Sequence, residues 1–456
     1  MDENKPHVIY IMSDEHRGQA MSHAGDPNVK TPVMDHLAQE GVSFALARTN
    51  YPICTPSRGT MFSGRHAHAG PVSGFFDVYK ATAPSTATIL RAEGYHTAYV
   101  GKWHCGIVPD QRPPEVVAHP KEYKGASSRT PEYHRAGFQD WYAHEWVDDP
   151  FASYYYKGSD INPTKLDGYE TDGFTDIVID YLRNYDRDEP LFLVLSVTPP
   201  HFPLVVPEQW KRFDPEALEV RPNFTDTPEM RQCLANYYAM IENLDWNIGR
   251  LMDTIRSLPK FENTLTAYFA DHGEFMGSHG RHNRKEHPHE ESVRVPAIFN
   301  CPGTIPARGN IDGLFSLVDL MPTTLGLLGV EIPPHNQGTD FTPGILGQAG
   351  FTGPDSVLME MVNNPRWNLD FLDWRGLVTD RWKYAFYETG AELLFDLEKD
   401  PYELDNLAEK NPEKRKEMKR LLLKRLAETR EPYFDVLIEH GVPAEGPVID
   451  VACEWK

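Results

Sequence analysis

The sequence predicts an α/β fold: a large, mostly parallel central sheet flanked by helices, followed by a smaller C-terminal α+β subdomain. Three observations support this prediction. Apolar runs typical of strands buried on both faces alternate with segments of helical periodicity. Each apolar run ends in charged or polar residues, as strands do at the edge of a parallel sheet where ligands bind. From about residue 355 the pattern changes to short strands and turns.

Four apolar, β-rich runs are the predicted strands of the central sheet, at residues 7–12, 97–100, 191–197 and 265–269. Carboxyl ends of parallel strands share one edge of a sheet, so we expect the polar groups that follow these runs to converge. The alternative is that each of them caps a helix or lies in a loop. The groups concerned are Asp14, Glu15, Lys102, His104, His201, Asp271 and His272.

Segments of helical character lie between these strands, at residues 32–40, 85–93, 171–185 and 228–257. We predict that residues 1–354 form the larger α/β domain and residues 355–456 the subdomain. The subdomain is expected to contain short strands at residues 376–379, 382–387 and 392–397, and then a helix. That helix has Asn411 as its cap, Pro412 in its first turn, and apolar residues at helical spacing, namely Met418, Leu421, Leu422 and Leu426.

The composition excludes several classes of partner. The 456 residues include 45 Lys plus Arg against 67 Asp plus Glu, a formal charge of −22. So acidic a protein repels nucleic acid and anionic membranes, and it must bind any anion through a local cluster of positive charge. No stretch approaches the ~20 apolar residues of a membrane span. Residues 1–6 lack the basic-then-apolar pattern of a secretory signal, so a cytoplasmic location is expected.

The five cysteines are few and odd in number, which argues against a disulfide scaffold, and no CxxC pair indicates structural zinc. One of them lies in a distinctive segment. The pattern Cys54-x-Pro56-Ser57-Arg58, with Gly64 six residues past the arginine, resembles the signature of the formylglycine-dependent sulfatases of the alkaline phosphatase superfamily. The resemblance implies that a separate formylglycine-generating enzyme oxidises Cys54 to Cα-formylglycine, the nucleophile. The alternative is a buried structural thiol.

The resemblance continues along nearly the whole chain. It includes Gly101-Lys102-Trp103-His104, Pro200-His201, Asp271-His272-Gly273-Glu274, Lys285 and the C-terminal segment 394–407. By resemblance, the catalytic residues are Cys54, Arg58, Lys102, His104, His201 and Lys285. Arg58 would orient the nucleophile, and the two lysines would face the sulfuryl oxygens. His104 fits the base acting on the second hydroxyl of the hydrated aldehyde, and His201, with Lys285, fits the acid on the leaving oxygen.

The same resemblance implies a divalent metal, held by Asp14, Glu15, Cys54, Asp271 and His272. Carboxylate oxygens suit Ca²⁺, which relatives usually bind, and also Mg²⁺, whereas a coordinating His272 favours Mn²⁺. Some positions depart from the family pattern. Glu15 stands where relatives carry Asp or Gln, and His272 where many carry Asn. His289 replaces a usual Tyr, and the stretch from His279 to Lys285 is one residue longer than is common, which puts the placement of Lys285 in question.

We therefore expect an enzyme that hydrolyses a sulfate ester of a carbohydrate or an aryl alcohol. The nearest alternative is a phosphonate monoester or phosphodiester hydrolase of the same superfamily. A non-catalytic binding protein is the alternative if Cys54 is not oxidised.

Two weaker patterns leave their function open. His279, His282, His287 and His289 fall within eleven residues. We expect them to form a solvated pocket rim, with His282 or His289 as possible substrate contacts and a transition-metal site as the alternative. Aromatic residues gather in two stretches and can stack on sugars, fill the core, or form an interface between subunits of a homo-oligomer. They are Trp141, Tyr142, Trp146 and Tyr154 to Tyr156 in the first stretch, and Trp367, Phe371 and Trp374 in the second.

Overall fold

The structure is a computed structural model that describes residues 5–75, 77–106, 128–146, 149–362 and 372–429. Its central sheet has ten strands in the order β10-β2-β9-β8-β1-β7-β3-β4-β5-β6. Their bounds are β1 His7–Ser13, β2 Val42–Phe44, β3 His96–Lys102, β4 Asp140–His144, β5 Tyr154–Lys157, β6 Thr164–Lys165, β7 Leu191–Val197, β8 Thr264–Ala270, β9 Ala297–Asn300 and β10 Gly309–Ile311.

The middle of this sheet is parallel, as predicted. Strand β1 pairs in parallel with β7 and β8, so that Tyr10 lies opposite Val194 on one side and Ala267 on the other. Strand β3 pairs in parallel with β7 and β4, and antiparallel strands lie toward both edges. Every residue of β1, β3, β7 and β8 is buried, which is why these strands are continuous apolar runs rather than alternating ones.

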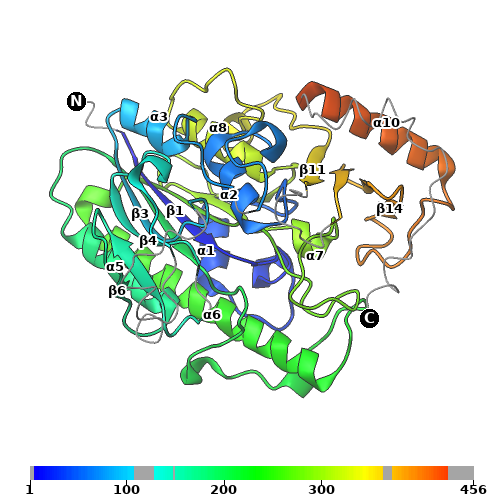
Figure 1. Cartoon of the computed structure of the whole chain (residues 1–456), viewed down its shortest axis with the longest axis horizontal. Coiled ribbons are helices and arrows are strands. Elements are labelled where there is room, and N and C mark those ends of the chain that lie inside the picture. Colours follow the sequence, from blue (N-terminus) through cyan, green and yellow to red (C-terminus); the bar gives the residue numbers. More distant parts are fainter. Residues whose placement is uncertain (1–4, 76, 107–127, 147–148, 363–371, 430–456) are drawn as a thin grey trace.

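Helices cover both faces of the central sheet (Figure 1). Tyr10 and Met12 of β1 face a cluster with α2 Cys54–Ser63, α3 Thr86–Ala92 and α8 Leu320–Leu327. Ile9 and Ile11 face the opposite cluster, with α1 Pro32–Glu40, α5 Glu170–Arg183 and α6 Pro228–Ser257. The four predicted helices are thus present, with ends within two residues of those expected. Two further short helices are α7 Glu290–Val293 and α9 Thr342–Ile345.

A second, antiparallel sheet lies at one end of the molecule, at the right in Figure 1. Its strands, in spatial order, are β11 Val357–Met361, β12 Trp374–Val378, β13 Trp382–Tyr387 and β14 Glu392–Asp396. Helix α10 Pro412–Thr429 packs on one face through Met418, Leu422 and Leu426. Asn411 accepts a hydrogen bond from the backbone N–H of Lys414 at 3.2 Å, as expected of its cap. The other face packs against Tyr51 and Ile53 beside α2.

The aromatic stretches mostly serve packing. Trp141 and Trp374 are each 1% exposed and belong to hydrophobic clusters, so the core alternative holds for them. Trp367 and Phe371 lie outside the described residues. No described helix combines the length and the apolar content needed to cross a bilayer.

Candidate active site

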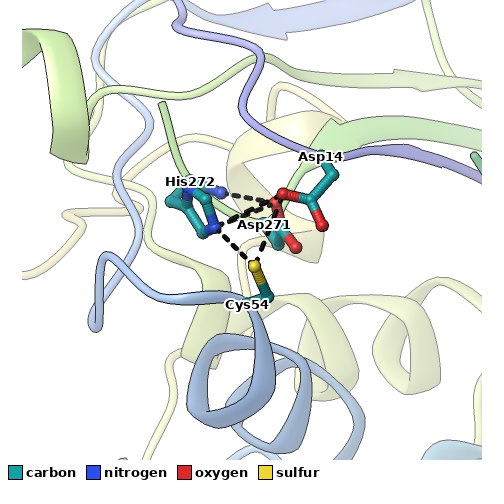
Figure 2. Close-up of side chains that lie close together, drawn as sticks. All are labelled: Asp14, Cys54, Asp271 and His272. Atoms are coloured by element: carbon teal, nitrogen blue, oxygen red, sulfur yellow. Dashed lines mark hydrogen bonds and ion pairs between the residues drawn. The ribbon is translucent and has the colours of Figure 1, made fainter. Parts of the chain in front are cut away.

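Predicted site residues from three separate segments converge at the carboxyl edge of the central strands. Asp14 follows β1, Asp271 follows β8, and Cys54 is the first residue of α2. Figure 2 shows the side chains of Asp14, Cys54, Asp271 and His272 pointing toward one another. All four are at most 1% exposed. The sheet topology therefore brings together groups that lie up to 258 residues apart in the chain.

The Cys54 thiol lies among positive charges. Its Sγ is 3.1 Å from Nε2 of His272 and 3.9 Å from Nζ of Lys285. Burial opposes ionisation, but the charges of Lys285, Lys102 and His272 outweigh it and lower the pKa of Cys54 well below its usual value. An acidic protein that binds an anion needs such a local positive focus, and position 54 lies within it.

Arg58 lies one helical turn after Cys54 and is fully buried. Its Nε donates to Asp271 Oδ2 at 3.0 Å, and its Nη2 donates to Asp14 Oδ2 at 3.1 Å. Its Nη1 donates to the carbonyl of Lys102 at 2.6 Å. The guanidinium group therefore fixes the ends of β1, β3 and β8 relative to one another. The Lys102 ammonium group donates to Asp14 as well, at 2.5 Å.

The four residues in Figure 2 form a set that fits a metal ion. Each offers one ligand atom, and these atoms all lie within 4.8 Å of one another. Burial and the neighbouring Asp14 charge raise the pKa of Asp271 to about 6. Arg58 binds the Oδ2 atoms of both carboxylates, while their Oδ1 atoms lie 3.4 and 3.7 Å from Nε2 of His272. Carboxylate oxygens gathered in this way are donors that suit a hard divalent ion.

His272 is oriented by its backbone. Its Nδ1 donates to the carbonyl of Gly273 at 2.9 Å, which directs Nε2 toward Cys54 and toward Asp14 Oδ1 at 3.4 Å. Burial disfavours the imidazolium, but Asp271 and Cys54 outweigh it and raise the pKa of His272 to about 10. A bound cation would take the place of the Nε2 proton, since metal ligands must be deprotonated.

Glu15 lies in a neighbouring group with His201 and Lys285. Its Oε1 accepts from the Lys285 ammonium group and lies 3.1 Å from Nε2 of His201, while its Oε2 accepts from the backbone N–H of Phe202 at 3.3 Å. The Lys285 ammonium group is also 3.1 Å from Nε2 of His201. The structure therefore brings Lys285 to the site despite the longer stretch before it, in which Asn283 adopts φ 52°.

His104 lies beside Cys54 and is 6% exposed. Burial lowers the pKa of His104 to about 4, although Cys54 partly offsets that effect. A neutral imidazole at this place can accept a proton, as a general base must. The His104 ring lies 6.4 Å from the ring of Trp146, so this aromatic residue is close to the site.

The four clustered histidines have different surroundings. His282 is exposed and lies edge-on to Phe202, at 4.7 Å between ring centroids. His289 is buried at 5% exposure, so the expected solvated rim is wrong for this residue. His279 lies with Glu291 and Glu403 in a possible metal-ligand group away from Cys54. Cations already neutralise these carboxylates, with Arg221 at 3.0 Å from Glu291 and Lys383 at 2.8 Å from Glu403.

The sequence did not single out two serines that support the site. Ser196 on β7 accepts a hydrogen bond from Nη1 of Arg58 at 3.0 Å, and Ser57 donates to the Asp271 carbonyl at 2.7 Å. Ser57 lies inside the cysteine motif, but its contact is a tertiary one. For Ser196, the only feature of the sequence that could have indicated a role in the site is its place near the end of a buried strand.

Comparisons with known proteins agree with this arrangement. The family model described as Sulfatase matches residues 6–330, and the one described as N-sulphoglucosamine sulphohydrolase, C-terminal, matches residues 277–432. An ulvan-active sulfatase of Formosa agariphila is 32% identical over 89% of this chain and 78% of its own length. A Bacteroides thetaiotaomicron structure, described under the metabolism of multiple glycosaminoglycans, has a TM-score of 0.86 and 27% identity, over 96% of this chain and 100% of the other. A phosphonate monoester hydrolase of Agrobacterium radiobacter shares the fold, with a TM-score of 0.75 and 22% identity over 93% of this chain and 96% of the other.

Proposed function

This chain belongs to the sulfatase family and is a sulfuric ester hydrolase, and from that premise we propose that it removes sulfate from a sulfated carbohydrate through a formylglycine nucleophile and a divalent cation. The observation that carries the proposal is the position of Cys54. It begins α2 at the point where Asp14, Asp271 and His272 converge, and Lys285 lies 3.9 Å from its sulfur.

Oxidation of Cys54 to the aldehyde gives the site its nucleophile. The hydrate has two hydroxyl groups, one to attack sulfur and one whose later deprotonation expels sulfate. Arg58 holds Asp14 and Asp271 in place around this position, since it donates to both carboxylates. Neutral His104 beside position 54 is the base that accepts the proton of the second hydroxyl.

The departing alcohol needs a proton, because an alkoxide is a poor leaving group. His201 is the donor that we assign to it. The side chain of His201 is 22% exposed, so solvent and a substrate can reach it, and its Nε2 lies 3.1 Å from both Glu15 and Lys285. Lys285 and Lys102 add positive charge toward the sulfuryl oxygens, where negative charge develops.

Asp14, Asp271 and His272 are the residues that would hold the divalent cation, with Glu15 and position 54 as further expected ligands. The cation supplies positive charge and Lewis acidity at a sulfuryl oxygen. We expect Ca²⁺ because carboxylate oxygens dominate the donor set, with Mg²⁺ or Mn²⁺ as alternatives.

Two relations support a carbohydrate as the substrate class. The Formosa agariphila relative is named for activity on ulvan, and the similar Bacteroides thetaiotaomicron structure is described under glycosaminoglycan metabolism. Trp146 lies near His104, where an indole can pack against a sugar ring.

The test combines peptide mass spectrometry across Cys54 with turnover assays, on protein co-produced with a formylglycine-generating enzyme. We expect a loss of about 18 Da at Cys54, the change from thiol to aldehyde, and hydrolysis of sulfated saccharides. Faster turnover of phosphodiesters than of any sulfate ester would favour the phosphonate or phosphodiester hydrolase instead. An unmodified thiol without turnover, under conditions that convert a control sulfatase, would favour a binding protein.

A further inference from the structure

A second pocket lies away from the catalytic residues, between the start of α1 and the middle of α6. This α1–α6 pocket has a volume of about 700 Å³, the size of a typical small-ligand site. Both helices pack on the face of the sheet opposite to α2, which carries Cys54. Figure 1 shows α6 running alongside α1. The residues that argue for a ligand are Lys30, Trp210, Arg212, Phe213, Glu242 and Trp246.

Two tryptophans give this pocket its aromatic wall. Trp246 on α6 is 46% exposed and Trp210 is half-buried, with ring centroids 5.9 Å apart at an interplanar angle of 53°. A guanidinium group lies over one face of each ring, Arg212 at 4.6 Å from the Trp210 centroid and Arg250 at 4.8 Å from that of Trp246. An exposed tryptophan keeps a large apolar area in contact with water. A ligand that covers this area therefore binds with a more favourable free energy.

The polar groups of the pocket are fixed in position. Arg212 Nη2 donates to Glu242 Oε2 at 2.6 Å, and Glu242 Oε1 accepts from the backbone N–H of Lys30 at 3.0 Å. The side chain of Arg212 is 56% exposed, and Lys30 is exposed as well. Asp214 and Asp245 also line the pocket, and Arg212 is paired with Glu242, so Lys30 is the cation left for an anionic group. Aromatic side chains beside a fixed hydrogen-bonding pair and one accessible ammonium group suit a sugar ring that carries several hydroxyl groups and a sulfate opposite Lys30.

We propose that the α1–α6 pocket is a second, non-catalytic binding site for sulfated saccharides. The inference rests on the proposed function, because a polysaccharide substrate offers many sugar residues beyond the one that reacts. Trp210 and Trp246 stack on the ring, the Arg212–Glu242 pair binds hydroxyl groups, and Lys30 faces a sulfate. Binding here raises the local concentration of polymer at the enzyme without contributing to the chemical step.

The test measures binding apart from catalysis. The protein migrates through native gels that contain ulvan or chondroitin sulfate, and through gels with the neutral polymer dextran. Wild-type protein, Trp246→Ala and Trp210→Ala are compared with Trp246→Phe, each also in a Cys54→Ala background that cannot turn substrate over. We expect retardation by at least one sulfated polymer, weakened about tenfold by either alanine substitution and much less by Trp246→Phe. Turnover of a small aryl sulfate should stay unchanged in the two alanine variants.

Equal retardation of wild-type protein and both alanine variants in every gel would overturn the proposal, as would the absence of retardation by the sulfated polymers. Light scattering on the same variants adds a second readout. A dimer that dissociates on Trp246→Ala, with retardation unchanged, would assign the pocket to self-association and overturn the saccharide site. The Cys54→Ala background reports binding alone. The binding result can therefore be interpreted even if the protein does not hydrolyse the proposed substrates.

Discussion

The Glu15 carboxylate and the Lys285 ammonium group form an ion pair beside the end of β1. The same Glu15 oxygen lies 3.1 Å from Nε2 of His201. The ligand atoms of Asp14, Asp271 and His272 gather around Cys54, and Asp14 also lies within 4.8 Å of the ligand atoms of Glu15 and His201. Glu15 thus holds the two residues assigned to the leaving-group side of the reaction, whatever it also contributes to a cation.

Glu15→Gln should slow the reaction most for substrates with poor leaving groups. The amide keeps the shape of the carboxylate but loses the charge that holds Lys285 and His201, and such partner losses cost about 10- to 100-fold. The measurement is kcat/KM for aryl sulfates of graded leaving-group pKa, with bound metal quantified in the same samples. Glu208→Gln, whose side chain is 86% exposed, is the control. Metal loss in step with activity would show that Glu15 acts chiefly as a metal ligand.

Cys54→Ala should abolish hydrolysis and leave the fold intact. The substitution removes the sulfur whose oxidation and loss would turn the β-carbon into the aldehyde, and losing a nucleophile costs roughly 10⁶-fold in kcat. Stability should change by no more than about 2 kcal/mol, because alanine fills most of the thiol's place at the start of α2. Sulfate release and thermal unfolding of the same preparation check both parts. A variant with wild-type turnover would remove Cys54 from the mechanism, and Cys301→Ala, at a buried cysteine outside the site, is the matched control.

Chelation should remove activity and lower the unfolding temperature. Arg58 and Lys102 neutralise part of the negative charge of Asp14 and Asp271, and a divalent cation would neutralise more of it, so its removal destabilises the folded state. Adding Ca²⁺ back should restore both properties. In His272→Asn an oxygen donor replaces the imidazole, so the preference for Ca²⁺ over Mn²⁺ should increase. Full turnover by metal-stripped protein would contradict a role for the cation, and an unchanged metal preference in His272→Asn would contradict coordination by this residue.

The inner strands of both sheets could be predicted because burial on both faces leaves a strong sequence signal. Residues 191–197 of the central sheet and 382–387 of the second sheet match the observed strands residue for residue. The short strands β2 and β10, near one edge of the central sheet, could not be predicted in this way. Val42–Phe44 and Gly309–Ile311 are three residues long and pair with each other across more than 260 residues of chain, so only tertiary packing defines them.

In the candidate site, too, some contacts could be predicted from the sequence and others could not. The cysteine motif predicts that Cys54 and Arg58 lie close together, because they are about one turn apart on the same helix. The direction of the Glu15 side chain does not follow from its place after Asp14, since it depends on Lys285, 270 residues away. Likewise, the contact of Ser196 with Arg58 needs β7 to lie beside β1 and β3, which a single strand cannot show.

Asp245 should make the protein less stable as pH rises. Its carboxylate, on α6, accepts hydrogen bonds from the backbone N–H groups of Val33 and Met34 at the start of α1. Burial nevertheless raises its pKa from 3.8 to about 7, although these hydrogen bonds oppose the shift. Between these two pH values the unfolded chain is ionised at this residue while the folded protein keeps the proton. Folding therefore binds a proton, and stability falls as pH rises through this window, by at most about 4 kcal/mol.

The comparison of wild type with Asp245→Asn isolates this effect, because the amide does not titrate. Urea unfolding at pH 5 and pH 8 should show that the variant gains stability relative to wild type at the higher pH. Asp253→Asn is the matched control on the same helix, since the side chain of Asp253 is 83% exposed. Its stability should follow the wild-type pH dependence. An equal change in wild type and Asp245→Asn would show that Asp245 is ionised in the folded protein at pH 5, with its charge stabilised by the N-terminus of α1.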